Sequence, residues 1–122
     1  MAGLVALLAA PAASAVEERS FAVRNTRQFV DLCATPATDP AYAQAMQFCH
    51  GFTAGALSYH RAQARPGTGA QYCNLPPTRQ QAAASFVSWA RNNPRVMDEN
   101  PANALFRYLD ANHACQGAAA RR

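Results

Sequence analysis

Lysine is absent from this chain of 122 residues, and all eleven of its basic side chains are arginines. The formal net charge is +4 at pH 7. Within the expected fold the arginines are scattered along the chain: Arg24, Arg27, Arg61, Arg65, Arg79, Arg91, Arg95 and Arg107. Proteins that bind nucleic acids usually gather their cations on one face, interleaved with aromatic side chains. We therefore expect no nucleic-acid partner and assign the charge to solvated surface.

The sequence also lacks the motifs of common catalytic and metal sites. It contains no G-x-S-x-G or comparable nucleophile motif. His50, His60 and His113 do not follow zinc-binding spacings, and no C-x-x-C pair is present. The few carboxylates within the expected fold do not suggest a catalytic acid pair. We expect a protein that is not an enzyme and that holds no metal or cofactor.

A long apolar run is missing as well, since a membrane span takes about 20 residues. The run Leu4–Ala10 is short and is followed by the small-residue pattern Ala13-Ser14-Ala15. This order is typical of the apolar core and cleavage site of a secretory signal peptide. We predict that residues 1–15 are a signal peptide and that residues 16–122 form one exported domain, located in the periplasm and not anchored in a membrane. The alternative is an alanine-rich N-terminal helix, because no Lys or Arg precedes the run.

The chain does contain four cysteines, Cys33, Cys49, Cys73 and Cys115. An even number of widely spaced cysteines in a short exported chain predicts disulfides. Cysteines that are paired in this way leave no free thiolate for catalysis. A domain of this size has a marginal apolar core, so we expect two covalent links to help stabilise it.

Helical periodicity predominates, and no segment alternates with period two over a useful length. Thr26 is a plausible N-cap for a first helix that ends at Cys33, before Pro36. Asp39-Pro40 predicts the start of a long second helix that reaches about Ala64. Pro77 and Pro101 predict the starts of the third and fourth helices. The fold class is therefore all-α, a compact four-helix domain with two disulfides.

Two glycines interrupt the second predicted helix. Gly51 and Gly55 lie one turn apart on the same face. A glycine inside a helix costs about 1 kcal/mol relative to alanine. We expect a neighbouring backbone to pack closely against them, and the alternative is that their placement has no packing reason.

Four cysteines allow three disulfide connectivities, and the sequence alone does not choose among them. The short connection between the third and fourth helices favours an antiparallel pair. That topology brings Cys73, before the third helix, towards Cys115, after the fourth. We therefore favour Cys73–Cys115 and Cys33–Cys49.

Several short motifs occur in an order that resembles the Rap/Tai family of type VI secretion amidase immunity proteins. They are Phe29-x-x-Leu32-Cys33, Cys49-His50-Gly51-Phe52-x-x-Gly55, Cys73 with Pro76, Asn93-Pro94, and Ala104-Leu105 before Cys115. The resemblance covers about Thr26 to Cys115. Two details depart from the family pattern: Pro76 follows its cysteine at three residues instead of two, and His113-Ala114 replaces an aromatic and a proline.

The resemblance implies a periplasmic helical protein, often a homodimer, that binds and inhibits a secreted cell-wall amidase. Such inhibition needs a rigid body and a presented loop. Residues 65–72 and 95–100 are the two candidate loops, and we favour the shorter second loop because ordering it costs less entropy. Its candidate contact residues are Arg95, Asp98 and Glu99. An alternative role for the two acids is to favour the positive end of the next helix.

A function of a different class also fits a small disulfide-linked helical domain. It is a structural or stress-response protein of the periplasm, such as an acid-activated chaperone. Such a chaperone would unfold as its carboxylates are protonated. Only seven acidic residues occur in the chain, so this switch is weak and we prefer the immunity function.

Overall fold

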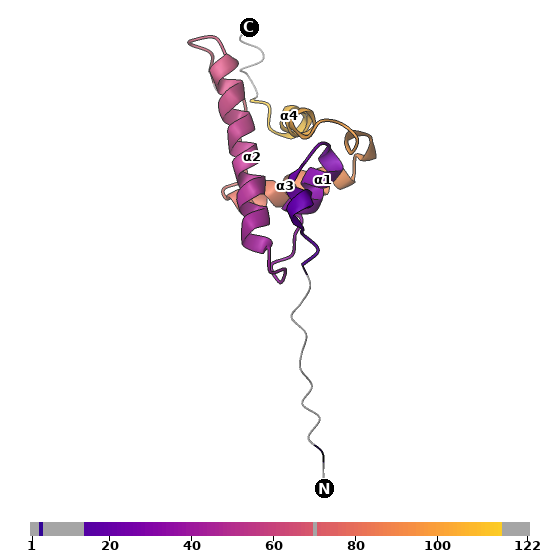
Figure 1. Ribbon diagram of the computed structural model, residues 1–122. Coiled ribbons are helices and arrows are strands. Elements are labelled where there is room, and N and C mark those ends of the chain that lie inside the picture. Colours follow the sequence, from indigo (N-terminus) through magenta and orange to yellow (C-terminus); the bar gives the residue numbers. More distant parts are fainter. Residues whose placement is uncertain (1–2, 4–13, 70, 116–122) are drawn as a thin grey trace.

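The computed structural model describes residue 3, residues 14–69 and residues 71–115 (Figure 1). Four α-helices follow one another in this part of the chain: α1 (Thr26–Cys33), α2 (Tyr42–Gln63), α3 (Arg79–Arg91) and α4 (Pro101–Asn112). Two short 3-10 helices precede α1 and α4, η1 (Glu18–Phe21) and η2 (Pro94–Val96). The all-α prediction is confirmed. Most of the predicted signal peptide lies outside the described residues.

Side-chain caps fix the starts of three of the helices. The Asn25 side chain accepts from the Gln28 N–H and caps α1, so the prediction that Thr26 caps this helix is wrong by one residue. Thr78 caps α3, which begins two residues after Pro77. Asn100 caps α4, and Pro101 occupies its first turn as predicted.

Helix α2 begins at Tyr42, later than the Asp39-Pro40 pair predicted. The Asp39 carboxylate accepts from the Ala41 N–H at 2.8 Å, which forms an Asx turn. The main chain differs from a helix start, because the Asp39 carbonyl accepts from the Tyr42 N–H, three residues on, at 3.0 Å, and so closes a turn before the helix. Pro40 therefore belongs to the turn, and Ala41 is the residue that precedes the first helical turn.

Helix α2 runs along one side of the group formed by α1, α3 and α4, and its C-terminal turns extend beyond them (Figure 1). The core lies between these elements and is mostly aliphatic and aromatic. Its large buried side chains are Phe29, Val30, Leu32, Phe86, Val87, Val96, Met97, Leu105, Tyr108 and Leu109. Phe29 is at the centre, with ring centroids 4.5 Å from Phe52 and 5.8 Å from Phe86. Full burial of such a side chain contributes about 1.5–3 kcal/mol.

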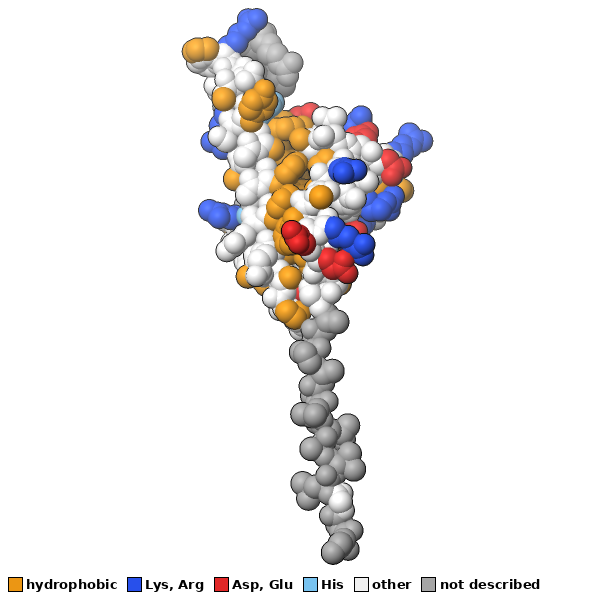
Figure 2. Space-filling model, viewed as in Figure 1, with side chains coloured by type: hydrophobic (Ala, Val, Ile, Leu, Met, Phe, Trp, Pro, Cys, Tyr) orange, Lys and Arg blue, Asp and Glu red, His pale blue; other side chains and the backbone are white. Residues whose placement is uncertain are grey.

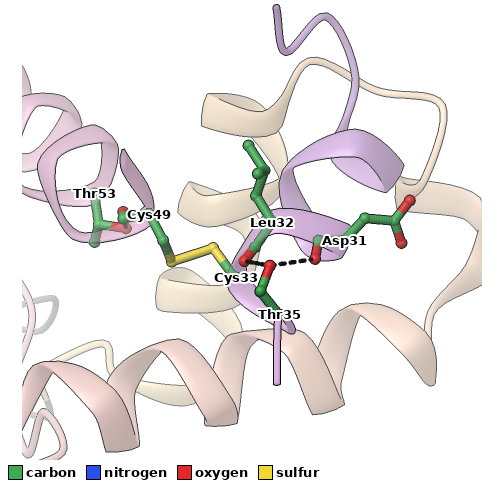
Figure 3. The surroundings of a disulfide bond; sticks show 6 residues. All are labelled: Asp31, Leu32, Cys33, Thr35, Cys49 and Thr53. Carbon is green, nitrogen blue, oxygen red and sulfur yellow. Dashed lines mark hydrogen bonds between the residues drawn. A yellow bond between two sulfur atoms is a disulfide. The ribbon is translucent and has the colours of Figure 1, made fainter. Parts of the chain in front are cut away.

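The first disulfide joins the end of α1 to the first half of α2 (Figure 3). Cys33 and Cys49 are bonded with their Cα atoms 5.3 Å apart, and both are buried. Directly after α1, the buried hydroxyl of Thr35 donates to the Leu32 carbonyl at 2.8 Å and so completes the end of the helix. The bond and this hydrogen bond together hold the turn between α1 and α2.

The second disulfide joins Cys73 to Cys115, with the Cα atoms 4.9 Å apart. Around it the two segments pair as an isolated antiparallel bridge between Tyr72 and Ala114. The Cys73 N–H donates to the His113 carbonyl at 2.7 Å. Both disulfides follow the connectivity that the helix order favoured. Among the described residues, no helix combines the length and apolar character that a membrane span requires.

Candidate partner-binding surface

Two residues in the middle of the loop between α3 and α4 anchor it in the core. Val96 at the end of η2 is 5% exposed and Met97 is 8% exposed, whereas Arg95 and Asp98 on either side are exposed. Two adjacent apolar side chains therefore point inward while their charged neighbours point outward. The loop therefore has a buried apolar face and an exposed charged face.

Main-chain hydrogen bonds fasten the same loop to the start of α1. The first N–H groups of a helix have no partner within the helix and need one from elsewhere. Here the Thr26 N–H donates to the Glu99 carbonyl at 2.9 Å, and the Arg27 N–H donates to the Met97 carbonyl at 3.0 Å. The Thr26 hydroxyl donates to the Glu99 carbonyl as well, at 3.0 Å, and Thr26 is fully buried. The loop is therefore held by elements that are distant in sequence.

Two ion pairs extend over the outside of the loop. Glu99 pairs with Arg107 of α4 at 2.9 Å, and Asp98 pairs with Arg27 of α1 at 3.8 Å. The Asp98 side chain is 89% exposed, so its pair is screened by water and contributes little to stability. The structure thus brings the predicted residues Arg95, Asp98 and Glu99 onto one fixed loop. Glu99 has a structural role in this loop, and the side chains of Arg95 and Asp98 are exposed.

The second candidate loop leads from the exposed end of α2 to Cys73. Gly67 has a φ of +82°, a left-handed conformation that favours glycine. At the end of the loop the Tyr72 hydroxyl donates to the Asp110 carboxylate at 2.9 Å. Burial raises the pKa of Tyr72 to about 12, and the hydrogen bond and negative charge of Asp110 act in the same direction. This loop is thus fixed at its Tyr72 end, whereas residues 65–69 are exposed.

An apolar groove beside α2 was not found by sequence reasoning. Its volume is about 520 Å³, and it lies between α2, the segment that carries Leu75 and Pro76, and the start of α3. Phe86 and Leu105 form part of its floor. Hydrophobic side chains also form a band beside α2 on the face seen in Figure 2. In the sequence, the groove is indicated only by Leu75, an isolated leucine between Cys73 and two prolines. In the structure, Leu75 is 47% exposed.

The predicted close packing at Gly51 and Gly55 is wrong within this chain. Both glycines are exposed, and a Cβ atom added to either would have no neighbour within 4 Å. Gly51 lies at the edge of the apolar groove. The outward direction of this helix face explains the error, because periodicity placed the two glycines together without showing which side of α2 is covered.

The three histidines are spread over different parts of the molecule. The His60 ring packs against Phe106 at a tilt, with ring centroids 4.6 Å apart, and contacts Gln71. His113 lies 3.0 Å from the Tyr108 hydroxyl through its Nε2 atom. No group of three metal-ligating side chains occurs among the residues whose positions are described. Burial raises the pKa of Tyr108, in keeping with a phenol packed into the core.

The fold and this surface define a disulfide-bonded helical scaffold that presents a fixed, charged loop. The sequence profile of the Rap1a immunity proteins matches residues 25–115. The chain belongs to this family, which confirms the resemblance read from the motifs, and membership implies that it binds a partner effector protein. No curated protein and no solved structure matches the chain.

Proposed function

We propose that this protein is a periplasmic immunity protein that binds a secreted peptidoglycan amidase and blocks its active cleft. Family membership supports the immunity role, and the two disulfides suit an oxidising compartment outside the cytoplasm. The absence of catalytic motifs in the sequence favours inhibition by binding over chemistry.

The observation that carries the proposal is the fixation of the loop at residues 95–100. A flexible loop loses conformational freedom when it binds, and that loss reduces affinity. Here the Met97 and Glu99 carbonyls are already bonded to α1, so this entropy is lost during folding instead of at binding. The outward side chains of Arg95 and Asp98 then meet the partner with their backbone preorganised.

An inhibition assay tests the proposal directly. The exported protein is added to a type VI secretion amidase encoded in the same genome, and cleavage of purified peptidoglycan is followed. We expect stoichiometric inhibition, and Asp98→Arg should weaken binding at least about tenfold, a loss of about 1.4 kcal/mol. Asp31→Arg is the matched control, because Asp31 is also exposed but lies outside this loop. Full activity of the amidase at excess protein would refute the proposed role.

The family role also implies a homodimer, which we include in the proposal. Tyr59 at 69% exposure is a large apolar side chain on the protruding end of α2. Light scattering on the purified protein measures the mass directly, and a Tyr59→Glu variant tests whether this end of α2 forms the contact. A monomeric mass at high protein concentration would contradict the dimer.

A further inference from the structure

The segment just before the predicted mature N-terminus is bound to one carboxylate, that of Asp39. The Ser14 hydroxyl donates to Oδ1 of Asp39 at 2.6 Å, and the Ala15 N–H donates to Oδ2 at 3.1 Å. These contacts join segments that are 24 and 25 residues apart in sequence. The predicted cleavage site therefore lies against the turn between α1 and α2.

Asp39 collects more donors than a turn residue needs. Oδ1 also accepts from the Ala41 N–H at 2.8 Å, which completes the Asx turn. The pKa of Asp39 is lowered, first by the Ser14 hydroxyl and then by the Ala41 N–H, with smaller contributions from the backbone N–H groups of Ala15 and Val16. The Val16 N–H donates to the Ser14 hydroxyl at 3.1 Å, and that hydroxyl donates to Asp39, so the Val16 nitrogen is linked to the carboxylate through one side chain that leaves with the leader.

The chain beyond Val16 is anchored independently of residues 14 and 15. Residues 18–21 form the 3-10 helix η1, and the Phe21 ring packs edge-on against Phe48 of α2 with centroids 5.7 Å apart. Val23 packs against the core cluster. Removal of everything before Val16 therefore leaves its nitrogen close to Asp39, because η1 and Phe21 still hold the segment.

We propose that Asp39 is the binding site for the mature amino terminus and pairs with the α-ammonium group of Val16. A leader peptidase adds water across the Ala15–Val16 peptide bond. The Ala15 carbonyl carbon gains the hydroxyl, and the Val16 nitrogen becomes an amine that is protonated at neutral pH. The Ser14 hydroxyl and the Ala15 N–H leave with the leader, and the new ammonium group takes their place at the carboxylate. This inference rests on the export assumed in the proposed function and adds a site to it.

The absence of lysine makes this group unusually easy to observe. With no lysine in the chain, the α-amino group is its sole primary amine. Reductive methylation with ¹³C-formaldehyde therefore labels one position only. An NMR titration of those methyl groups then reports the pKa of the labelled Val16 amine without assignment of the rest of the spectrum.

The test uses the chain exported from its full-length precursor, with any tag placed at the C-terminus. Intact mass gives the N-terminus, and the titration is run on the wild type, Asp39→Asn and Asp31→Asn. Asp31 lines the same surface hollow as Asp39, together with Arg19, Arg24 and Arg91, and has an exposed side chain. We expect a mature chain that begins at Val16 and an α-amino pKa that falls by about half a unit or more in Asp39→Asn only.

Asparagine keeps an oxygen that can accept from the Ala41 N–H, so the Asp39→Asn variant should retain the turn. The wild type in 6 M urea serves as a second reference that needs no variant. A mature chain that begins at a residue other than Val16 would overturn the inference. An α-amino pKa that is the same in the native wild type, in Asp39→Asn and in the wild type in urea would also overturn it. Amidase inhibition is measured separately, so failure of this contact is distinguishable from failure of the proposed function.

Discussion

The buried hydroxyl of Thr26 offers a sharp test of how the loop between α3 and α4 is held. Thr26→Val keeps the size and the β-branched shape of the side chain and removes only the donor. The Glu99 carbonyl then keeps the Thr26 N–H at 2.9 Å but loses the hydroxyl at 3.0 Å. A typical intramolecular hydrogen bond contributes about 0.5–1.5 kcal/mol, and burial places this one towards the upper end. We expect a loss of about 1–1.5 kcal/mol in the free energy of unfolding.

Thr53→Val is the matched control for this substitution. The Thr53 hydroxyl donates to the Cys49 carbonyl at 3.0 Å, within a single helix and at a partly buried position. Its loss leaves contacts between elements unchanged, so we expect a decrease below about 0.5 kcal/mol. Urea unfolding followed by circular dichroism at 222 nm measures both changes. Equal stability of Thr26→Val and wild type would show that the hydroxyl does not fasten the loop.

Hydrogen exchange gives a second reading of the same contact. The amides of Thr26 and Arg27 stand at the start of a helix, where N–H groups without a partner exchange quickly. Because the Glu99 and Met97 carbonyls accept from them, we expect both amides to be protected in the wild type. Faster exchange in Thr26→Val than in Thr53→Val would locate the loosening at this junction. Unprotected amides in the wild type would contradict the described geometry.

Three further predictions concern other parts of the fold. Cys73→Ala with Cys115→Ala opens a link of 42 residues and should cost up to about 4 kcal/mol in urea unfolding, and a loss below 1 kcal/mol would contradict the entropic account. Gly51→Ala should stabilise the protein by about 0.5–1 kcal/mol, since the added methyl group meets nothing within 4 Å, and thermal unfolding checks the sign. Tyr72 should ionise near pH 12. Because its folded pKa is raised above the ordinary value of 10, the stability that it contributes is complete below pH 10 and is lost as the pH rises towards 12. Absorbance at 295 nm, compared with Tyr72→Phe, measures this step, and an unchanged titration curve would count against the raised pKa.

Local signals in the sequence were sufficient to locate the four helices, but not to choose the disulfide pairing. Proline at 101 and the apolar spacing from Phe29 to Cys33 act within one or two turns, so their consequences can be read without a structure. The cysteine pairing followed from the order of the helices. The Asp39-Pro40 pair was placed too early as a helix start, because residues 39–42 form a turn before α2. The contacts of the same carboxylate with residues 14 and 15 join distant segments, and no local pattern reports them.

The surface was harder to predict than the scaffold. The sequence placed Arg95, Asp98 and Glu99 in one loop, and their contact with a partner stays a prediction. Only the structure separates Glu99, which pairs with Arg107, from the exposed side chains of Arg95 and Asp98. The prediction of close packing at Gly51 and Gly55 was wrong for a related reason. A helical period tells which residues share a face, whereas the packing of other elements decides whether that face is covered.

Helix α1 holds the loop at residues 95–100 mainly through the main-chain oxygens of Met97 and Glu99, since the exposed pair between Asp98 and Arg27 contributes little. A carbonyl oxygen is the same whatever residue carries it, so substitutions at positions 95 and 98 leave this attachment intact. In the proposed contact with an effector, the side chains at 95 and 98 can therefore change together with the effector's surface while the helices beneath the loop stay the same. Specificity for one effector would then diverge between strains faster than the fold that supports it.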